Sequence, residues 1–536
     1  MNDALQQVYA YHDASKHHFD AYAPGPEFLD WTGQPNPFRR FSGAPLVELP
    51  LQETPLAPSY QELFQTPEQS ADINLSTLST LLQYSFGLAA WKQYGGERWS
   101  LRCNPSSGNL HPTEVYILIS GMADFKSGLY HYAVREHALE LRCEVEAPFT
   151  GLLIAFSSVH WREAWKYGVR AFRYCQHDAG HAYAALQYAA AVHGWHAQML
   201  EEWSDDDIAA ILGLTRSADF IDGERETPDM ICRLIPFPAS TDTPIQQGHI
   251  RVDRLIQALG AGLWRGTADA LGSEHIRWPA IEAVSRATEK PRTSASRYKT
   301  TAAQPRLPLI SLEPAAAVIR NRRSAQAYDG KTQISSTQLY RMLDATLPYR
   351  DGPPFQTWPW APRVHLILFV HRVKDLAPGL YLFCRSDDAP TELRTGLRAE
   401  FEWNKPDNCP ETLNFFRLVA ANAKNTAKRL SCLQAIAADS CFSLGMIAEF
   451  EPALQAAPWA YRQLYWECGV IGQILYLEAV AAGYGGTGIG CFFDDPVQEL
   501  IDITKRRWHS LYHFTVGGSV FDMRIQTLEA YAHLAR

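Results

Sequence analysis

Three arginines and a serine lie close together in the segment IRNRRSAQAYDG: Arg320, Arg322, Arg323 and Ser324. A phosphate monoester carries nearly two negative charges, and proteins neutralise it with guanidinium groups, hydroxyls and backbone N–H groups. The segment therefore has the composition of a phosphate site, although a solvated basic helix end would contain the same residues. The equivalent point in the first half of the chain, SKHHFDAY, offers only Lys16 and two histidines.

A second candidate segment is the turn in CNPSSGNLHPTEVY, residues 103–116, which supplies Pro105, Ser106, Ser107 and Asn109. Such a turn presents small side chains and backbone donors to a flat heterocycle, although an ordinary hairpin loop uses the same residue types. In the second half the corresponding place reads PPFQTWPWAPRVHLILFV, where Trp358 and Trp360 replace the small residues. We therefore expect the second copy of this turn to be filled in.

The third segment is GYGGTGIGCFFDD, residues 483–495, which contains Gly488, Ile489 and Gly490. Glycine lets the backbone approach a ligand closely. The pattern lacks the preceding strand and following helix of a dinucleotide fingerprint, so a Rossmann site is not expected. The matching stretch of the first half, GWHAQMLEEWSDDD, has lost these glycines. Because each half keeps what the other lacks, the sequence predicts one composite site.

The elements that must position these segments occur twice along the chain. LSTLLQY at 78–84 and STQLYRMLDA at 336–345 each precede a strand pair with Gly-Leu-Tyr at a strand start, so that Gly128 matches Gly379. Residues 172–195 and 461–484 both have apolar residues at helical spacing and end at a glycine followed by an aromatic residue. Both runs are followed by an acidic pair. The order helix, strand pair, long buried helix, turn and strand is thus repeated.

This repeat and the length of 536 residues predict two domains, because a single core rarely grows past roughly 250 residues. We expect an N-terminal arm over 1–60, extended on the surface because it is rich in proline and aromatic residues. A first domain over 61–262 and a second over 313–536 follow, joined by a surface linker over 263–312 that includes KPRTSASRYKTTAAQPRLPL.

The chain resembles the SagB/ThcOx branch of the nitroreductase superfamily, whose members are FMN-dependent dehydrogenases that oxidise azolines to azoles in ribosomally made peptides. The resemblance covers nearly the whole chain from YHDASKHH onward. It implies an α+β fold in which two nitroreductase-like three-layer domains are fused as an intrachain pseudo-dimer. It also implies one FMN per chain, where a family dimer has two.

The resemblance assigns the cofactor-binding residues. The family's RRSxRxF-type motif, which holds the FMN phosphate and ribityl chain, falls on Arg322, Arg323, Ser324, Gln326 and Tyr328. Gln326 departs from the pattern, because the family has a second basic residue there. The PSSGN loop resembles the segment that reaches the isoalloxazine across the dimer interface, and GTGIG resembles the turn over the pyrimidine side of the ring. Arg524, in VGGSVFDMRIQTLEAY, matches an arginine that also reaches the phosphate.

The resemblance also implies the catalytic pair. In EAWKYGVRAFRY, residues 163–174, Lys166 and Tyr167 match a Lys-Tyr pair that azoline dehydrogenases use. Aromatising an azoline removes a proton from one carbon and a hydride equivalent from its neighbour, so a base must face the flavin. Desolvation or the neighbouring Arg170 would lower the pKa of a lysine enough for this role, and a tyrosine could relay the proton. The second repeat's PWAYRQLYW lacks the lysine.

Composition narrows the remaining possibilities. A formal net charge of -9 without a polybasic tail argues against nucleic acid or an anionic membrane as a partner. The N-terminus has no apolar signal segment and the ten cysteines include no CxxC pair, so we expect a reducing cytoplasm. Residues 469–483 are too short and polar to span a bilayer and should form a buried helix. His177 and His181 have metal-compatible spacing, but no acidic or cysteine ligand accompanies them, and no metal site is expected.

The leading hypothesis is an FMN-dependent dehydrogenase of an azoline-type, peptide-derived substrate, with a cyclodehydratase as a candidate partner. An NAD(P)H-dependent nitro or quinone reductase is the alternative, and would need an open stacking pocket but no catalytic base. A third hypothesis is a flavin-free scaffold or peptide-binding subunit, because one site is degenerate and Gln326 departs from the family pattern.

Overall fold

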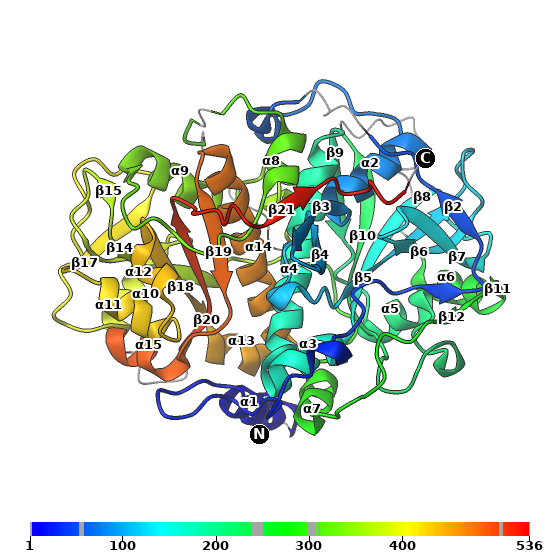
Figure 1. The fold of residues 1–536 in the computed structure, drawn as a ribbon, viewed down its shortest axis with the longest axis horizontal. Coiled ribbons are helices and arrows are strands. Elements are labelled where there is room, and N and C mark those ends of the chain that lie inside the picture. Colours follow the sequence, from blue (N-terminus) through cyan, green and yellow to red (C-terminus); the bar gives the residue numbers. More distant parts are fainter. Residues whose placement is uncertain are drawn as a thin grey trace.

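The computed structural model describes residues 3–52, 58–237, 250–296, 298, 306–308, 311–502 and 507–534. Two mixed helix-and-sheet halves lie side by side, and two long helices, α4 (Ala171–Ala191) and α14 (Ala460–Ala481), run between them (Figure 1). Two paired α+β domains within one chain are the arrangement expected from the sequence.

The first-half sheet is antiparallel at every pair of neighbours. Its order is β11 (Leu263–Trp264), β7 (Ala138–Glu144), β6 (Gly128–Ala133), β5 (Thr113–Ser120), β8 (Gly151–Ser158), β10 (Thr227–Pro236) and β9 (Trp195–Met199), with β2 (Leu46–Glu48) also paired to β7. Strands β5, β6 and β8 are buried on both faces and read as nearly continuous apolar runs, as expected of strands covered on both sides.

The second-half sheet repeats this order. It runs β17 (Asn414–Ala420), β16 (Gly379–Cys384), β14 (Val364–Val370), β18 (Phe442–Glu449), β20 (Trp508–Gly517) and β19 (Gly485–Ile489). The two edge strands β9 and β19 each follow a long central helix, and the matched Gly128 and Gly379 each open a strand. The loose sequence repeat therefore corresponds to one topology used twice.

The helices named in the repeat also match. Helices α2 (Leu75–Ser85) and α9 (Ser336–Ala345) precede the strand pairs, while α5 (Asp205–Leu212) and α15 (Asp494–Ile501) begin at the acidic pairs. Aspartates in a first turn stabilise the helix, because its N-terminus carries partial positive charge. The other helices are α1 (Asp3–Ala14), α3 (His160–Tyr167), α6 (Val252–Gly260), α7 (Pro279–Ala287), α8 (Ala315–Asn321), α10 (Ala389–Gly396), α11 (Lys424–Leu430), α12 (Ala435–Asp439) and α13 (Phe450–Ala456).

Helices α4 and α14 form the core between the halves. A methyl group on Gly180 would collide with the carbonyl of Trp466, and one on Gly469 would collide with the carbonyl of His177. Glycine at these points lets the helix backbones touch. His177 donates a hydrogen bond through Nε2 to the Leu511 carbonyl (3.1 Å), whereas its Nδ1 has no hydrogen-bond partner among the described residues. One continuous apolar cluster extends through both halves.

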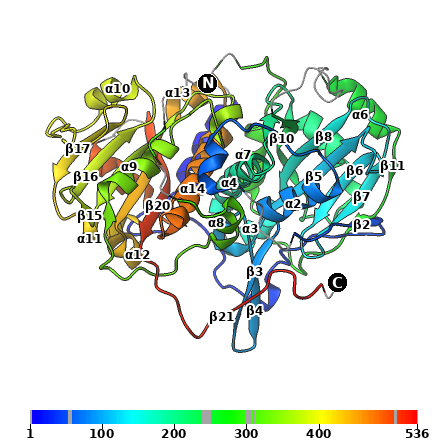
Figure 2. The ribbon, with the colours of Figure 1, turned by 90° about the horizontal axis from the view of Figure 1, so that it is seen from above.

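A third sheet joins the end of the chain to the first half. Strand β21 (Gln526–Leu528) pairs with β3 (Leu88–Tyr94), which forms a hairpin with β4 (Glu97–Arg102). Figure 2 shows this hairpin projecting from the body with β21 beside it. The Tyr531 hydroxyl accepts a hydrogen bond from the backbone N–H of Leu88 (2.8 Å). The C-terminal segment therefore crosses from the second half and is anchored in the first.

Two segments differ from the expected arm and linker. The arm opens with a helix, α1, whose Leu5, Val8 and Tyr11 are buried. Helix α1 packs on α7, which lies inside the expected linker and buries Ile281 and Val284. Both helices are amphipathic and cover core surface, so these segments are partly folded. Residues 297, 299–305, 309 and 310 of the linker lie outside the described residues.

Within the described ranges, no helix is long and apolar enough to cross a membrane. The apolar run 469–483 lies mostly in α14 and is largely buried against α4.

Candidate functional site

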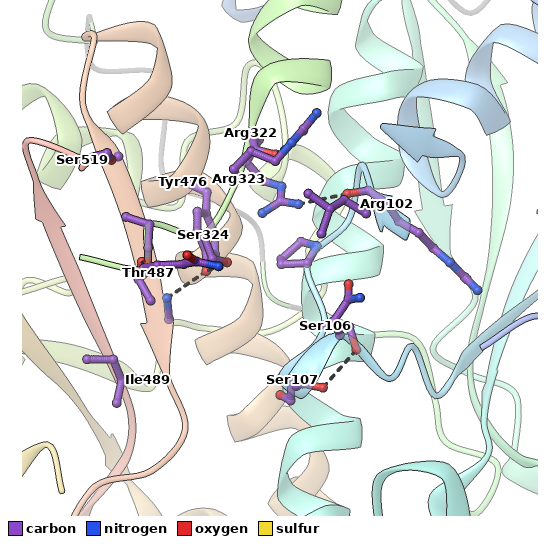
Figure 3. Close-up of a pocket in the computed structure, with 18 of the residues that line it drawn as sticks. Arg102, Ser106, Ser107, Arg322, Arg323, Ser324, Tyr476, Thr487, Ile489 and Ser519 are labelled. Carbon is purple, nitrogen blue, oxygen red and sulfur yellow. Dashed lines mark hydrogen bonds between the residues drawn. The ribbon is translucent and has the colours of Figure 1, made fainter. Parts of the chain in front are cut away.

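A cavity of about 820 Å³ lies between the two halves. Its lining comes from the turn after β4, from α3 and α4, from the segment after α8, from β19 and from the C-terminal crossing segment. Figure 3 shows Ser106 and Ser107 on one side and Ser324, Thr487 and Ile489 on the other, with Arg322 and Arg323 toward one end. The volume is in the range of small-molecule and cofactor pockets.

The first-half wall is the 105–109 turn, whose shape is held by hydrogen bonds. The Ser106 hydroxyl accepts from the backbone N–H of His111 (2.8 Å), and the Asn109 amide donates to the Ser100 carbonyl (2.9 Å). Gly108 has φ +59°, and a Cβ there would lie 2.5 Å from the Tyr167 hydroxyl. Glycine is needed here for both its backbone conformation and its lack of a side chain.

The second-half wall joins the arginine segment to β19. Ser324 pairs with Gly486 in a parallel bridge, and the Thr487 hydroxyl donates to the Ala325 carbonyl (2.7 Å). The Tyr476 hydroxyl of α14 lies 2.7 Å from the Ser324 hydroxyl and accepts from the backbone N–H of Gly488 (2.9 Å). This single phenol therefore fixes both segments.

A positive charge without a counter-ion lies at one end of the cavity. Arg322 is buried and donates to the carbonyls of Arg102 and Cys103, both at 2.9 Å. Arg323 donates to the Ala89 carbonyl (3.1 Å), and burial, then the charge of Arg322, lowers its pKa to about 10. In the described part of the chain neither arginine forms a salt bridge with a carboxylate. Burying unpaired charges is costly, so this end of the cavity favours an anion.

A buried carboxylate lies at the cavity wall. Asp178 of α4 accepts hydrogen bonds from the backbone N–H and the hydroxyl of Ser107, both at 3.1 Å. Burial raises the pKa of Asp178 to about 7. Glu163 of α3 is also buried, and its carboxyl oxygens make no hydrogen bond; burial, then the charge of Asp178, raises its pKa well above the usual range. Two buried carboxyl groups with raised pKa values thus lie beneath the 105–109 turn.

Comparisons with known proteins place this fold. A model of the nitroreductase family matches residues 71–222, within the first half. A solved structure named as a nitroreductase of Anabaena variabilis is 22% identical, has a TM-score of 0.66, and covers 96% of this chain and 99% of its own. The fold is nitroreductase-like. Because the match spans nearly all of both chains, the paired-domain arrangement is shared as well.

Two other solved structures match less of the chain. A nitroreductase-named protein of Ralstonia eutropha is 13% identical over 42% of this chain and 90% of its own, with a TM-score of 0.26. A chain of the Escherichia coli microcin synthetase McbBCD complex is 16% identical over 42% of this chain and 80% of its own, with a TM-score of 0.28. No curated protein matches the sequence.

The nitroreductase-like domains bring most of the predicted binding residues into one cavity. Its lining includes Pro105, Ser106, Ser107, Asn109, Arg322, Arg323, Ser324, Gln326, Gly488, Ile489 and Gly490. Arg524 is not in the lining: it is exposed, pairs with Asp522 (2.7 Å) and lies over the ring of Tyr94. Its neighbours Asp522, Met523 and Ile525 line the cavity instead.

The two predicted catalytic residues are separated. Tyr167 lines the main cavity, whereas Lys166 lines an adjacent hollow of about 270 Å³ that shares Tyr167 and Tyr174 with it. The Lys166 ammonium lies over the rings of Trp31 (5.5 Å) and Tyr167 (5.4 Å). Burial lowers the pKa of Lys166.

The two halves would place a second cavity where the segment around Trp358 meets β9, but side chains close that position. The Thr357 hydroxyl donates to the Ala197 carbonyl of β9 (2.9 Å), and the neighbouring Trp358 ring is buried against Tyr183, with ring centroids 5.4 Å apart. Thr357 and Trp358 thus cover edge strand β9, whereas its counterpart β19 faces the cavity. This arrangement agrees with the prediction that the second turn is filled in.

Sequence reasoning missed Asp178, Tyr476 and Tyr512, all of which line the cavity. The signal for Asp178 was present, because a lone carboxylate in a helix predicted to be buried needs a partner or a function. Nothing in the local sequence indicated that Tyr476 would reach two segments at once, or that Gly488 must lack a side chain because of the Tyr512 hydroxyl.

Proposed function

We propose that this protein is an FMN-dependent dehydrogenase with a single FMN in the cavity between its domains. The observation that carries the proposal is the cavity itself. At one end, arginines without a counter-ion in the part of the chain that the structure describes would bind an anion, and small side chains and backbone form the walls. Members of the nitroreductase family typically bind a flavin, which supports this cofactor. In this proposal Arg323, Ser324 and the backbone around Ala325 hold the phosphate.

The remaining cavity walls suit a flat ring. The 105–109 turn and β19 face one another, and both carry glycines where a side chain would collide with Tyr167 or Tyr512. Backbone groups of 488–490 would meet the ring edge, and the small side chains Ser106 and Ser107 would cover its face. When bound, FMN would supply the two-electron acceptor that this chain's own side chains lack.

Two candidate groups could remove the substrate proton. Asp178 is nearest to the cavity, and a base whose pKa lies near 7 is well matched to proton transfer at neutral pH. Lys166 has a lowered pKa but lines the neighbouring hollow, with Tyr167 between it and the cavity. We propose that Asp178 accepts the proton, that Tyr167 orients the substrate, and that Lys166 acts through Tyr167.

The proposed substrate is an azoline ring, thiazoline or oxazoline, in a modified peptide, and this assignment rests on the resemblance to SagB/ThcOx-type dehydrogenases. A cyclodehydratase that forms such rings is the proposed partner. Anaerobic addition of a thiazoline-containing peptide to the purified protein should bleach the flavin spectrum and give a product lighter by two hydrogens. No bleaching with any azoline peptide, by a protein that holds FMN, would contradict the substrate class.

A second candidate is an NAD(P)H-dependent nitro or quinone reductase, favoured by the position of Lys166 outside the main cavity. Such an enzyme needs no base opposite the ring. Bleaching of the flavin by NADH or NADPH, with an unchanged rate in both Lys166→Ala and Asp178→Asn, would support it. A loss of turnover in Asp178→Asn with FMN still bound would support the dehydrogenase.

A further inference from the structure

Two of the ten cysteines differ from the rest. All ten are free thiols, and eight are buried, whereas Cys432 and Cys491 are half-buried. Cys491 lies two residues after the end of β19 and lines the main cavity, while Cys432 lies in the loop between α11 and α12. Two hydrogen bonds tie these segments: the Phe493 N–H donates to the Leu430 carbonyl (2.9 Å), and the Gln434 amide donates to the Cys491 carbonyl (3.1 Å).

The Cys432 thiol and the His17 imidazole both interact with the Cys491 thiol. The Ala23 N–H donates to His17 Nδ1 (2.9 Å), so the neutral imidazole carries its proton on Nε2. Interaction with Cys432, and then with His17, lowers the pKa of Cys491, whereas the pKa of Cys432 is raised. The pair therefore has an attacking thiolate and a thiol beside it.

Charged groups around the pair favour the thiolate on Cys491. Arg170 of the helical turn after α3 donates to the Gly490 carbonyl (3.1 Å) and lies over the ring of Phe492 (4.8 Å). The negative charge nearby, on Asp494, is already held by Arg170 (2.9 Å) and Arg173 (2.6 Å). A positive neighbour of this kind is the usual environment of a reactive cysteine.

The backbone of Cys432 is held in an unusual conformation. Cys432 has φ +49° and Leu433 has φ +61°, two consecutive non-glycine residues in the left-handed region. Such residues persist only where the surroundings enforce them, and they gather at functional sites. Here the strained loop is fixed at its two ends to the segment that carries Cys491.

We propose that Cys432 and Cys491 form a redox-active dithiol that reduces a small disulfide entering the cavity. The Cys491 thiolate attacks one sulfur of the disulfide RSSR, breaks the S–S bond and releases RS⁻, which takes a proton from water. Cys432 then loses its proton to solvent and attacks the Cys491 sulfur, which forms the Cys432–Cys491 disulfide and releases the second RS⁻. Two protein thiols are oxidised and one RSSR is reduced, so this activity does not depend on FMN.

Oxidised glutathione tests the proposal on the full-length protein. After incubation, alkylation and peptide mapping, the wild type should lose two thiols and carry a single disulfide between Cys432 and Cys491. Cys432→Ser should stop at glutathione bound to Cys491, because no second thiol resolves it. Cys491→Ser should react at least roughly 100-fold more slowly, because the thiolate is gone. Cys409→Ser, which removes a buried thiol elsewhere, is the matched control and should behave like the wild type.

Three results would overturn the proposal. They are a wild type that keeps ten thiols, glutathione that remains on Cys491 in the wild type, and a Cys491→Ser variant that reacts at the wild-type rate. Labelling of the unmodified wild type with limiting iodoacetamide gives a readout that needs no variant to fold. Cys491 should be alkylated before the eight buried cysteines, and equal labelling of all ten would also count against the pair.

Discussion

Replacing Asp178 by asparagine should change how the stability of the protein depends on pH. Burial raises the pKa of Asp178 from 3.8 to about 7, so the folded state resists ionisation of this group more than the unfolded state does. The associated stability is fully present below the unfolded pKa and is lost as pH rises between the two values. At 1.36 kcal/mol per pKa unit, the penalty approaches roughly 4 kcal/mol above pH 7.

Asparagine keeps the shape and an oxygen that accepts from Ser107, but it cannot ionise. Relative to the wild type, Asp178→Asn should therefore gain roughly 2 to 3 kcal/mol of unfolding free energy between pH 5 and pH 8. Urea denaturation of both proteins at the two pH values measures this difference. Because the charge of Asp178 also raises the pKa of Glu163, the same comparison is made in a Glu163→Gln background, where that neighbouring group cannot ionise. A difference that is the same at pH 5 and pH 8 would refute the placement of Asp178 as a buried acid with a raised pKa.

The same variant tests the proposed proton transfer. If Asp178 accepts the substrate proton, kcat should fall about 10²- to 10⁴-fold while FMN stays bound. The wild-type rate should rise through pH 7 as the carboxylate forms, and that rise should be absent from any residual activity of the variant. Full activity with an unchanged pH profile would remove Asp178 from the reaction.

Two further substitutions test the walls of the site. Tyr476→Phe removes the hydroxyl that bonds Ser324 and Gly488, so FMN affinity by fluorescence titration should fall roughly 10-fold, whereas Tyr381→Phe, whose hydroxyl bonds far from the cavity, should leave it unchanged. An unchanged affinity in Tyr476→Phe would contradict the role of that phenol. Trp358→Ala should lose about 3 to 5 kcal/mol of stability, measured by denaturation, yet gain no second FMN. An unchanged stability would show that the ring does not fill its position.

The paired-domain fold was largely predictable because each half carries the same periodic signals. The long apolar runs at 172–195 and 461–484 and the strand starts at Gly128 and Gly379 specify local elements, and repeated elements imply repeated topology. The segments expected to meet at one cavity do line one cavity, where the 105–109 turn of the first half lies opposite the arginine segment and β19 of the second half.

Other features depend on contacts that local pattern does not encode. The segment VGGSVFDMRIQTLEAY gives no sign that its end pairs with β3 of the first half. Arg524 was therefore expected at the phosphate, but it lies in solvent beside Asp522. Lys166 and Tyr167 are adjacent in sequence, but successive helical side chains point about 100° apart, so Tyr167 reaches the main cavity and Lys166 lines only the neighbouring hollow. Helix α1 precedes the proline-rich part of the arm, and its burial against α7 depends on a contact with a distant segment.

Each chain is proposed to hold one composite flavin site, and the amount of bound FMN decides this. The visible spectrum of the purified protein, followed by heat release and quantification of the free flavin, gives this number after saturation with FMN. One FMN per chain is expected. Two would mean that the position closed by Trp358 binds as well, and none would contradict the flavin site altogether.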